Sequence, residues 1–265
     1  MKKIFKIINF VIILELFFCV STFALLIPKK YMPKEEENTL EIIDNVKIEA
    51  LEEKVPTIDD VILKDVQVGD IVTFGRFYEM KMEDEVEKVP IKWKVLDKIG
   101  DSALLISNDI IKTMPYNANW NVTTWKDSSL RSWLNNDFLD IAFNDLEKEL
   151  IDKVIIKNNG NTYTNVVENY ITRDDVFILN IEEAHKYFGK DSTLMAVGTE
   201  YAKKEGLWLS TYATSRGYSV WWLRNPGKSL SFVSIVHAGG TIGTAGDGVA
   251  TRGNGVRPCI WVKTK

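Results

Sequence analysis

The sequence predicts a domain of the α+β class, and three observations lead to this fold class. Strand-like segments open the folded part of the chain, helical spacing fills its middle, and strands with glycine-rich loops close it. With 265 residues, 45% hydrophobic and 26% charged, the chain has enough apolar material for one good-sized core. All eight tryptophans lie beyond residue 90, so the core is expected there. We expect one main domain over residues 65–265.

The first residues predict export. A cationic head from Lys2 to Lys6 is followed by residues 7–27, which are almost entirely apolar. Residues 22–24 form a small-x-small cleavage site, whereas a length of about 20 apolar residues also suits a membrane span. Residues 1–28 are therefore either a signal peptide or an N-terminal membrane anchor. If uncleaved, they attach the protein to the membrane.

The next segment predicts an acidic stalk or linker over residues 29–64. Glu35, Glu36 and Glu37 are followed by further acids among aliphatic residues, and the segment holds no tryptophan and no glycine. Residues 39–54 have a loosely apolar side but no sustained heptad. We expect a solvated spacer between the cell envelope and the domain.

Three segments at the start of the domain predict β-strands. Residues 70–74 are rich in β-formers, and residues 91–96 alternate strictly between apolar and polar side chains. Residues 102–107 form a more continuously apolar run, which is typical of a strand buried on both faces.

Helical spacing follows in the middle of the domain. Asp127 or Ser128 can cap a first helix. Its expected core positions recur three or four residues apart: Leu130, Trp133, Leu134, Phe138 and Ile141. Further helices are expected from Asn144 to about Ile155, from Ile181 to Phe188 and from Thr199 to Lys204, with Gly189 and Gly206 as stop signals and a strand at residues 176–179.

The last third of the domain predicts strands and loops. Strand segments are expected at residues 208–210, 219–223, 232–237 and 256–262. Seven of the sixteen glycines lie between Gly239 and Gly255. This density predicts tight, exposed turns in place of regular strands.

Two blocks near the C-terminus carry a resemblance to a known family. The first reads Trp221-Trp222-Leu223-Arg224-Asn225-Pro226-Gly227, and the second reads Gly255-Val256-Arg257-Pro258 before an aromatic strand. Together they resemble a functionally uncharacterised bacterial domain family with WWLR-x-P-G and GVRP signatures. Residues 69–76 and 125–138 also match that family, so the resemblance spans about residues 65–265. It implies a C-type-lectin-like fold with an irregular antiparallel sheet, several central helices and long Gly-rich loops, distantly similar to the formylglycine-generating (sulfatase-modifying) fold.

The sequence lacks the residues with which better-known proteins of similar fold bind metals or catalyse reactions. C-type lectins bind sugars through calcium ligands, but the nearest strings, Asn225-Pro226 and Trp133-Leu134-Asn135, lack the carboxylates. The formylglycine-generating branch uses paired cysteines, and the domain holds Cys259 alone. We therefore expect no metal and no cofactor.

Charge and histidine content limit the function classes further. A formal net charge of -4 and a pI near 5.4 provide no basic field, so nucleic acid is not an expected partner. The chain has two histidines, His185 and His237, which leaves little for histidine-based catalysis.

The signature residues are interpreted as structural. Arg224 and Arg257 can each fix neighbouring loops by hydrogen bonds to backbone carbonyls or a carboxylate. The rings of Trp221, Trp222 and Trp261 can fill the core beneath them. Ligand contacts are then expected on the glycine-rich loops, and the candidates are Tyr218, His237, Thr241, Asp247, Thr251, Arg252 and Asn254.

These observations favour an exported or surface-tethered binding module, secreted or anchored with the domain outside the cell. It would recognise a glycan or a protein at the cell surface through its C-terminal Gly-rich loops, without catalysis. The alternative is a cell-envelope hydrolase or amidase that uses carboxylates, although the sequence shows no recognisable pair. A purely structural surface protein is a third hypothesis.

Overall fold

The computed structural model of the chain describes residues 57–80, 85–189 and 191–265. The predicted signal or anchor and most of the predicted stalk lie outside these residues. Within them the chain forms two five-stranded sheets, two short two-stranded sheets and several short helices, which confirms the predicted α+β class. In this described part, no helix is long and apolar enough to cross a membrane.

The first sheet is antiparallel throughout and has the order β1-β2-β3-β14-β5. The fully buried ring of Trp93 packs on its inner side, and its Nε1 donates to the carbonyl of Phe74 at 2.7 Å. The three predicted opening strands are confirmed, and the first two are longer than expected. The strands are β1 (Ile71–Met80), β2 (Val86–Ile99), β3 (Ser102–Ser107), β14 (Cys259–Lys263) and β5 (Ile151–Asp152).

The second sheet has the order β12-β11-β10-β13-β4, and its pairs are antiparallel except for β10 with β13. Every residue of β10 is buried, so this strand forms the sheet's centre. The strands are β12 (Ile242–Gly248), β11 (Phe232–Val236), β10 (Trp221–Pro226), β13 (Gly255–Val256) and β4 (Lys112–Thr113).

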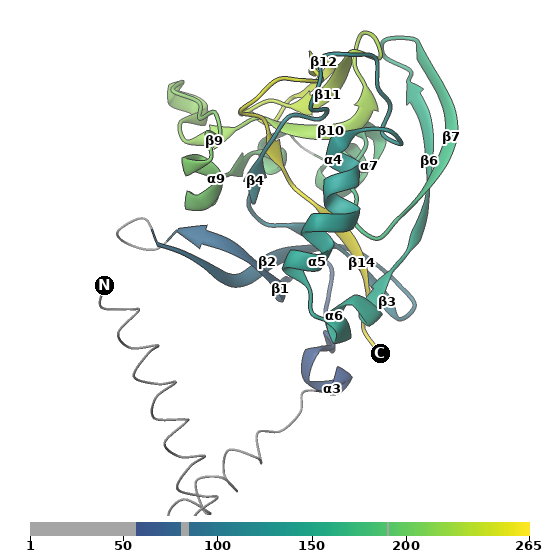
Figure 1. The fold of residues 1–265 in the computed structure, drawn as a ribbon, viewed down its shortest axis with the longest axis vertical. Helices are drawn as coiled ribbons and strands as arrows, with labels where there is room; N and C mark the ends of the chain where they lie inside the picture. Colours follow the sequence, from purple (N-terminus) through teal and green to yellow (C-terminus); the bar gives the residue numbers. More distant parts are fainter. Residues whose placement is uncertain (1–56, 81–84, 190) are drawn as a thin grey trace, which may run out of the picture. The chain divides into compact units, whose positions relative to one another are not determined.

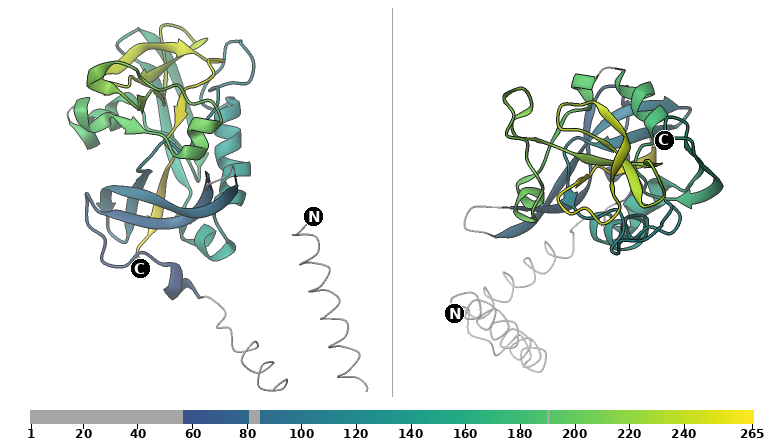
Figure 2. Two further views of the ribbon diagram at one scale, coloured as in Figure 1. Left: turned by 90° about the vertical axis from the view of Figure 1, so that its left-hand side faces the viewer. Right: turned by 90° about the horizontal axis from the view of Figure 1, so that it is seen from above.

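The C-terminal segment connects the two sheets. β13 and β14 are separated only by Arg257 and Pro258, yet they belong to different sheets. Figure 1 shows β14 running from the second sheet, at the top, to the first sheet, and the left view of Figure 2 shows the same course. The expected continuous strand at 256–262 is therefore interrupted near its start, at Arg257 and Pro258, because a proline cannot donate to a sheet ladder, and residues 259–262 form a strand as expected.

Two small sheets and the helices complete the domain. The small sheets pair β6 (Val154–Asn161) with β7 (Val166–Asp174) and β8 (Ala196–Val197) with β9 (Tyr218–Ser219). The helices are α3 (Ile58–Val61), α4 (Ser129–Trp133), α5 (Leu139–Ala142), α6 (Asp145–Leu150), α7 (Ile181–Phe188), α8 (Asp191–Leu194) and α9 (Glu200–Lys204), with a π-helical turn η3 (Leu134–Phe138) and a 3-10 turn η4 (Ala213–Ser215).

Side-chain caps begin the central helices where the sequence predicts them. The Oγ of Ser128 accepts from the backbone of Arg131 at 3.1 Å. In α7, Asn180 and Glu183 form a capping box, and Gly189 ends the helix with φ 67°. The predicted helix at 181–188 is thus confirmed in both its start and its stop.

The helix that starts after Asn144 is shorter than predicted. It ends at Leu150 and not near Ile155. The β-branched residues Val154, Ile155 and Ile156 begin β6 instead, because such side chains fit a pleated strand better than a helix.

β12 corrects the expectation that the glycine-rich segment holds no regular strand. This strand pairs with β11 over Ile242–Gly248. A Cβ on Gly246 would lie 2.0 Å from the carbonyl oxygen of Val233, and a Cβ on Gly248 would lie 2.1 Å from the ring of Trp120. These two glycines permit close approach of neighbours within the sheet, in addition to supplying turns.

Two other expected strands are not regular strands. Residues 208–210 form a loop whose backbone N–H groups at Trp208 and Ser210 bond to Gly253 and Tyr218. Residues 176–179 make a single bridge, between Phe177 and Cys259. This second segment is buried as an extended run, so its apolar pattern reflects the core and not a ladder.

Candidate functional site

The predicted ligand residues lie at two separate places on the second sheet. His237 and Thr241 are exposed at the turn between β11 and β12, where the His237 N–H donates to the Thr241 carbonyl at 2.8 Å. Asp247, Thr251, Arg252 and Asn254 lie at or beyond the other end of β12. At a rise of 3.3–3.4 Å per residue, β12 separates the two groups by about 20 Å. The structure does not bring the predicted candidates into one site.

The second group forms a compact loop. The N–H of Thr251 donates to the carbonyl of Gly248 at 2.9 Å, which closes a turn. Asn254 is 4% exposed, and its Nδ2 donates to Asp247 Oδ2 at 2.9 Å. Asn254 therefore fixes the loop from inside, whereas Thr251 is half-buried and Arg252 is exposed.

Tyr218 lies beside this loop. It is half-buried in β9, and the next residue, Ser219, donates its Oγ to the carbonyl of Trp208. The N–H of Trp208 in turn donates to the carbonyl of Gly253 at 2.9 Å. Tyr218 is thus connected to the 249–254 loop through Trp208.

Three exposed aromatic side chains of the 119–122 and 208–217 segments were not among the predicted site residues. Trp120, Trp208 and Tyr212 are 62%, 47% and 73% exposed, although Trp93, Trp125, Trp221 and Trp222 are buried. Trp208 and Tyr212 stand in a stretch of small and polar residues between Gly206 and Gly217. That composition was the available signal for aromatic rings on a loop.

Two of these exposed residues are attached to the scaffold near the ends of the 249–254 loop. Trp120 lies against Gly248 and makes an edge-to-face contact with Phe232 at 5.7 Å between ring centroids. Trp208 is tied to Gly253 through its backbone. We call the surface made by Trp120, Trp208, Tyr212, Thr251 and Arg252 the loop face; β9, β11 and β12 near it lie at the end of the domain opposite the C-terminus in Figure 1.

The signature residues are mostly buried, unlike the loop face. Arg224 donates to both carboxylate oxygens of Glu183, at 3.1 and 3.2 Å, and to the carbonyl of Ile178. Trp221 and Trp222 are fully buried, and Trp261 is half-buried. These contacts fix β10 to the first turn of α7.

Arg257 is buried without a carboxylate partner among the described residues. Its Nε and Nη2 donate to the carbonyl of Ser107 at 3.2 and 3.0 Å, and Nη2 also reaches the carbonyl of Asn108. The guanidinium lies over the rings of Trp221 and Phe188, at 4.9 and 5.7 Å from their centroids. Burial lowers the pKa of Arg257 to about 10.

A polar cavity of about 290 Å³ lies beneath the β6–β7 hairpin. Its walls come from both strands of the hairpin, from the start of α7 and from β10. We call it the hairpin cavity; its lining includes Asn158, Thr162, Glu168, Asn180, Glu182 and Arg224.

Glu168 is the unusual group of this cavity. Burial raises the pKa of its carboxyl from 4.5 to about 7, although the Tyr170 hydroxyl, which donates to Oε2 at 3.3 Å, lowers it in part. The other oxygen, Oε1, is buried without a hydrogen-bond partner. Burial and the nearby Glu168 raise the pKa of Tyr170 to about 12.

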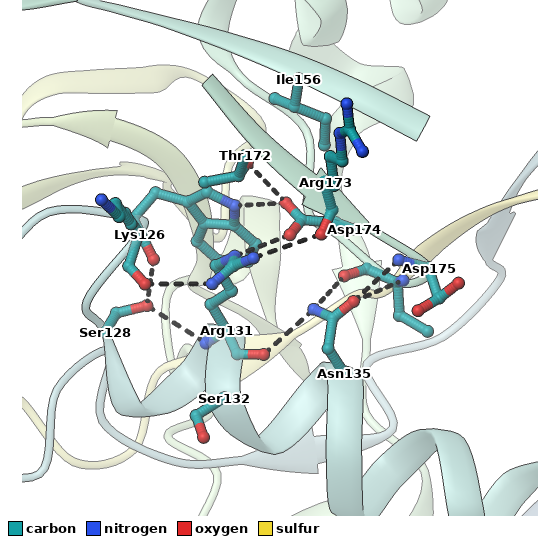
Figure 3. Close-up of polar contacts among 12 residues, drawn as sticks. Lys126, Ser128, Arg131, Ser132, Asn135, Ile156, Thr172, Arg173, Asp174 and Asp175 are labelled. Atoms are coloured by element: carbon teal, nitrogen blue, oxygen red, sulfur yellow. Dashed lines mark hydrogen bonds and ion pairs between the residues drawn. The ribbon is translucent and has the colours of Figure 1, made fainter. Parts of the chain in front are cut away.

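A buried network fixes the base of the hairpin. Figure 3 shows Arg131, from α4, reaching Asp174 at the end of β7, with Nε to Oδ1 at 2.6 Å. Thr172 also donates to Asp174, and Asn135 bonds the backbone of Asp175 and Val176. The cavity wall is therefore attached firmly to the central helix.

A second cavity of about 460 Å³ lies against the β1–β2 hairpin and the start of α9. Phe77, Val89 and Ile111 give it a partly apolar wall. Its acid Glu79 accepts the backbone N–H groups of Met80 and Tyr201 and so helps to hold α9 on β1. None of the predicted site residues lines it.

Metal binding finds no support in the described residues. No three of their His, Cys, Asp and Glu side chains are grouped so that they could hold an ion. His185 is exposed on α7, and Cys259 is fully buried, where desolvation raises the pKa of its thiol.

Comparison with known proteins gives a family but no function. A family model described as "Domain of unknown function (DUF6273)" matches residues 100–264. This span contains the loop face and the hairpin cavity. No curated protein and no solved structure matches the chain.

Proposed function

The chain belongs to the DUF6273 family, a domain of unknown function, and we propose that it is a binding module that recognises a glycan through the loop face. This agrees with the uncharacterised family expected from the sequence. The single observation that carries the proposal is the exposure of two tryptophans that contact the ends of the 249–254 loop: Trp120 lies against Gly248, and the backbone of Trp208 bonds to Gly253. The family description supplies no activity.

Exposed rings on a fixed loop suit sugar recognition. The face of an aromatic ring carries negative charge density, and the C–H bonds of a sugar ring pack against it. The ring of Trp120 is positioned by Gly248 and Phe232, so it loses little freedom on binding, and the backbone of Trp208 is fixed by its bond to Gly253. Thr251 and Arg252, in the loop between Gly248 and Gly253, can donate to sugar hydroxyls.

A glycan fits this surface better than a protein does. The core of a protein interface is usually a continuous apolar patch with a polar rim. The loop face combines exposed aromatic side chains with the polar residues Thr251 and Arg252. Aromatic rings together with hydrogen-bonding groups match a chain of sugars, whose rings and hydroxyls alternate.

The finer fold and the location belong to the same proposal. Two features support a C-type-lectin-like arrangement: irregular, mostly antiparallel sheets connected by the C-terminal segment, and several short helices between the strands. Residues 1–28 support export, with the domain outside the cell, secreted or anchored. Such a location would expose the loop face to cell-surface glycans.

A glycan array with the full-length chain tests the proposed function. We expect Trp208→Ala and Trp120→Ala each to weaken binding of the best glycan by about tenfold or more, which corresponds to about 1.4 kcal/mol. Tyr163, 60% exposed in the β6–β7 turn, offers a matched control, and Tyr163→Ala should bind as the parent does. Binding that is lost equally in all three variants, or binding only to a protein, would refute the proposal.

One observation favours the alternative of an envelope hydrolase. Glu168 and Glu182 line the same cavity, and the raised pKa of Glu168 suits a general acid. Release of the aryl group from a panel of nitrophenyl glycosides would test this. If turnover occurs and both Glu168→Gln and Glu182→Gln abolish it, the enzyme is the better description.

A further inference from the structure

The hairpin cavity contains one buried polar atom without a hydrogen-bond partner in the described structure and one amide that makes only a long contact. Glu168 Oε1 is buried and accepts no hydrogen bond in the described structure. The Asn158 amide makes only a long contact, 3.4 Å from its Nδ2 to the carbonyl of Ile156. A buried carboxylate oxygen without a donor is costly, by roughly 1–3 kcal/mol. These groups are therefore positioned for something other than the stability of the hairpin.

The charges around the cavity leave little net attraction for an ion. The guanidinium of Arg224 is already bound by Glu183 through two hydrogen bonds. At the rim, the positive charge of Lys157 and the negative charge of Glu182 are both exposed and offset each other. Glu168 itself has its pKa raised to about 7, so its charge is partly lost at neutral pH. A neutral ligand suits these walls.

The chemistry of the walls fits hydroxyl groups. Asn158 and Asn159 each carry a donor and an acceptor side by side, and Thr162 adds a hydroxyl at the rim. Each sugar hydroxyl is likewise a donor and an acceptor, so neighbouring hydroxyls pair with an amide in two hydrogen bonds. In Glu168, Oε2 already accepts from the Tyr170 hydroxyl, and Oε1 is left to accept from a hydroxyl of the ligand.

The size of the cavity limits the ligand to one small unit. Its 290 Å³ lies at the lower end of the range of about 300–1,000 Å³ for ligand pockets. The anchoring of the hairpin base through Asp174 and Arg131 argues against a large opening movement. One sugar ring is the appropriate scale.

We propose that the hairpin cavity is a second, independent binding site that takes one neutral monosaccharide unit, with Glu168 and Asn158 as its hydrogen-bonding contacts. The proposal does not rest on the loop face, because the two sites share no residue. The cavity is lined from β6, β7, α7 and β10, whereas the loop face is built from the 119–122, 208–217 and 249–254 segments.

The test titrates the full-length chain with matched small probes, observed by ligand NMR. N-acetylglucosamine and glucose are the neutral probes; glucosamine and glucuronate carry a positive and a negative charge. We expect at least one neutral probe to bind with a dissociation constant on the order of 1 mM, and both charged probes to bind about tenfold more weakly. Tighter binding of a charged probe would overturn the assignment of a neutral ligand.

Three variants locate the bound sugar. Glu168→Gln should weaken binding about tenfold, because an amide cannot accept on both atoms. Thr162→Val is an exposed change that cannot harm the core, and it should weaken binding a fewfold. Glu149→Gln, an exposed acid on α6, is the matched control and should bind as the parent does.

The outcomes separate this site from the loop face. Trp208→Ala should leave binding of the monosaccharide in the cavity unchanged. If no neutral probe binds, or if binding is lost in Trp208→Ala but kept in both Glu168→Gln and Thr162→Val, the hairpin cavity is not a sugar site.

Discussion

Two buried guanidinium groups, Arg224 in β10 and Arg257 between β13 and β14, lie at the same depth in different surroundings. Both residues are 3% exposed. Arg224 is matched by the carboxylate of Glu183, which also caps α7. Arg257 has only carbonyl oxygens and the ring faces of Trp221 and Phe188, and its Nη1 has no partner in the described structure.

The difference shows two ways to keep a guanidinium out of water. At Arg224, the opposite charge offsets desolvation, so the stability of the site depends on a pair. At Arg257, two aromatic faces and backbone dipoles stabilise the cation. Its pKa is nevertheless lowered to about 10, because these contacts do not fully offset the loss of hydration. Near Arg224, the stability of the fold should therefore depend on both members of the Arg224–Glu183 pair. Near Arg257, it should depend on the packing of the guanidinium against rings and carbonyls.

The largest effect is expected from Arg224→Ala. It removes the partner of Glu183 and leaves the buried carbonyl of Ile178 without its donor, so the free energy of unfolding should fall by about 3–5 kcal/mol. Urea unfolding of the full chain measures it. A loss below about 1 kcal/mol would mean that Glu183 turns to solvent without penalty.

Arg257→Ala should cost less, about 2–4 kcal/mol, because no buried charge is left behind. The loss comes from the carbonyls of Ser107 and Asn108 and from the gap opposite Trp221. The same urea series gives the value. An unfolding midpoint equal to that of the parent would contradict the structural role of Arg257.

Glu183→Gln tests the Arg224–Glu183 pair from its carboxylate side. It keeps one hydrogen-bond acceptor and removes the charge, so we expect a loss of about 1–2 kcal/mol. In a double-mutant cycle with Arg224→Lys, the coupling should be on the order of 1 kcal/mol. A cycle of Glu183→Gln with Arg257→Lys is the control and should show additive losses.

Glu168→Gln should change the pH dependence of stability near Arg224. Because the folded-state pKa of Glu168 is raised from 4.5 to about 7, the carboxyl is neutral in both states at low pH. Between those values the unfolded chain loses the proton first, so wild-type stability falls as pH rises. The full shift corresponds to about 3 kcal/mol, but the half-exposed carboxyl is screened, so we expect about 1 kcal/mol.

Thermal unfolding of both proteins at pH 4.5 and pH 8 tests this shift. The stability of the wild type relative to Glu168→Gln should be lower at pH 8. An unchanged difference would show that Glu168 ionises normally in the folded chain.

The smallest effect is expected from Arg252→Ala, the exposed arginine of the same C-terminal region. Its free energy of unfolding should stay within about 0.5 kcal/mol of the parent value. This variant supplies the baseline against which the two buried arginines are compared. A loss above about 1 kcal/mol would mean that Arg252 is part of the scaffold and not of the loop face.

The sequence predicted the elements whose signals are local. Ser128 and Asn180 cap helices where capping was expected, and the alternating residues around Trp93 form a strand. The β6–β7 hairpin was missed for a physical reason. Asn158 and Glu168 point inward over a polar cavity, whereas Val167 is 82% exposed, so the usual apolar-in pattern is reversed.

The candidate site was predicted only in part. Thr251 and Arg252 are on an accessible loop, but His237 and Thr241 lie at the opposite end of β12, and Asn254 is buried. The high number of glycines led to a prediction of turns in this segment. A sequence does not show which glycines lie against a neighbouring ring or carbonyl, so strand β12 was not predicted. The exposed tryptophans were missed because exposure depends on what packs over them, and this comes from distant segments.

The course of residues 255–263 through both sheets also determines when the domain can form. β14 pairs with β3 and β5 in the interior of the first sheet, and β13 lies between β10 and β4 in the second. A ribosome makes these residues after every other strand of both sheets, so neither sheet can be complete before residue 263 has been synthesised. Folding of both sheets must wait for this segment and for pairings between residues far apart in sequence, which makes it slow. A premature stop just before Gly255 would therefore remove an interior strand from both sheets at once.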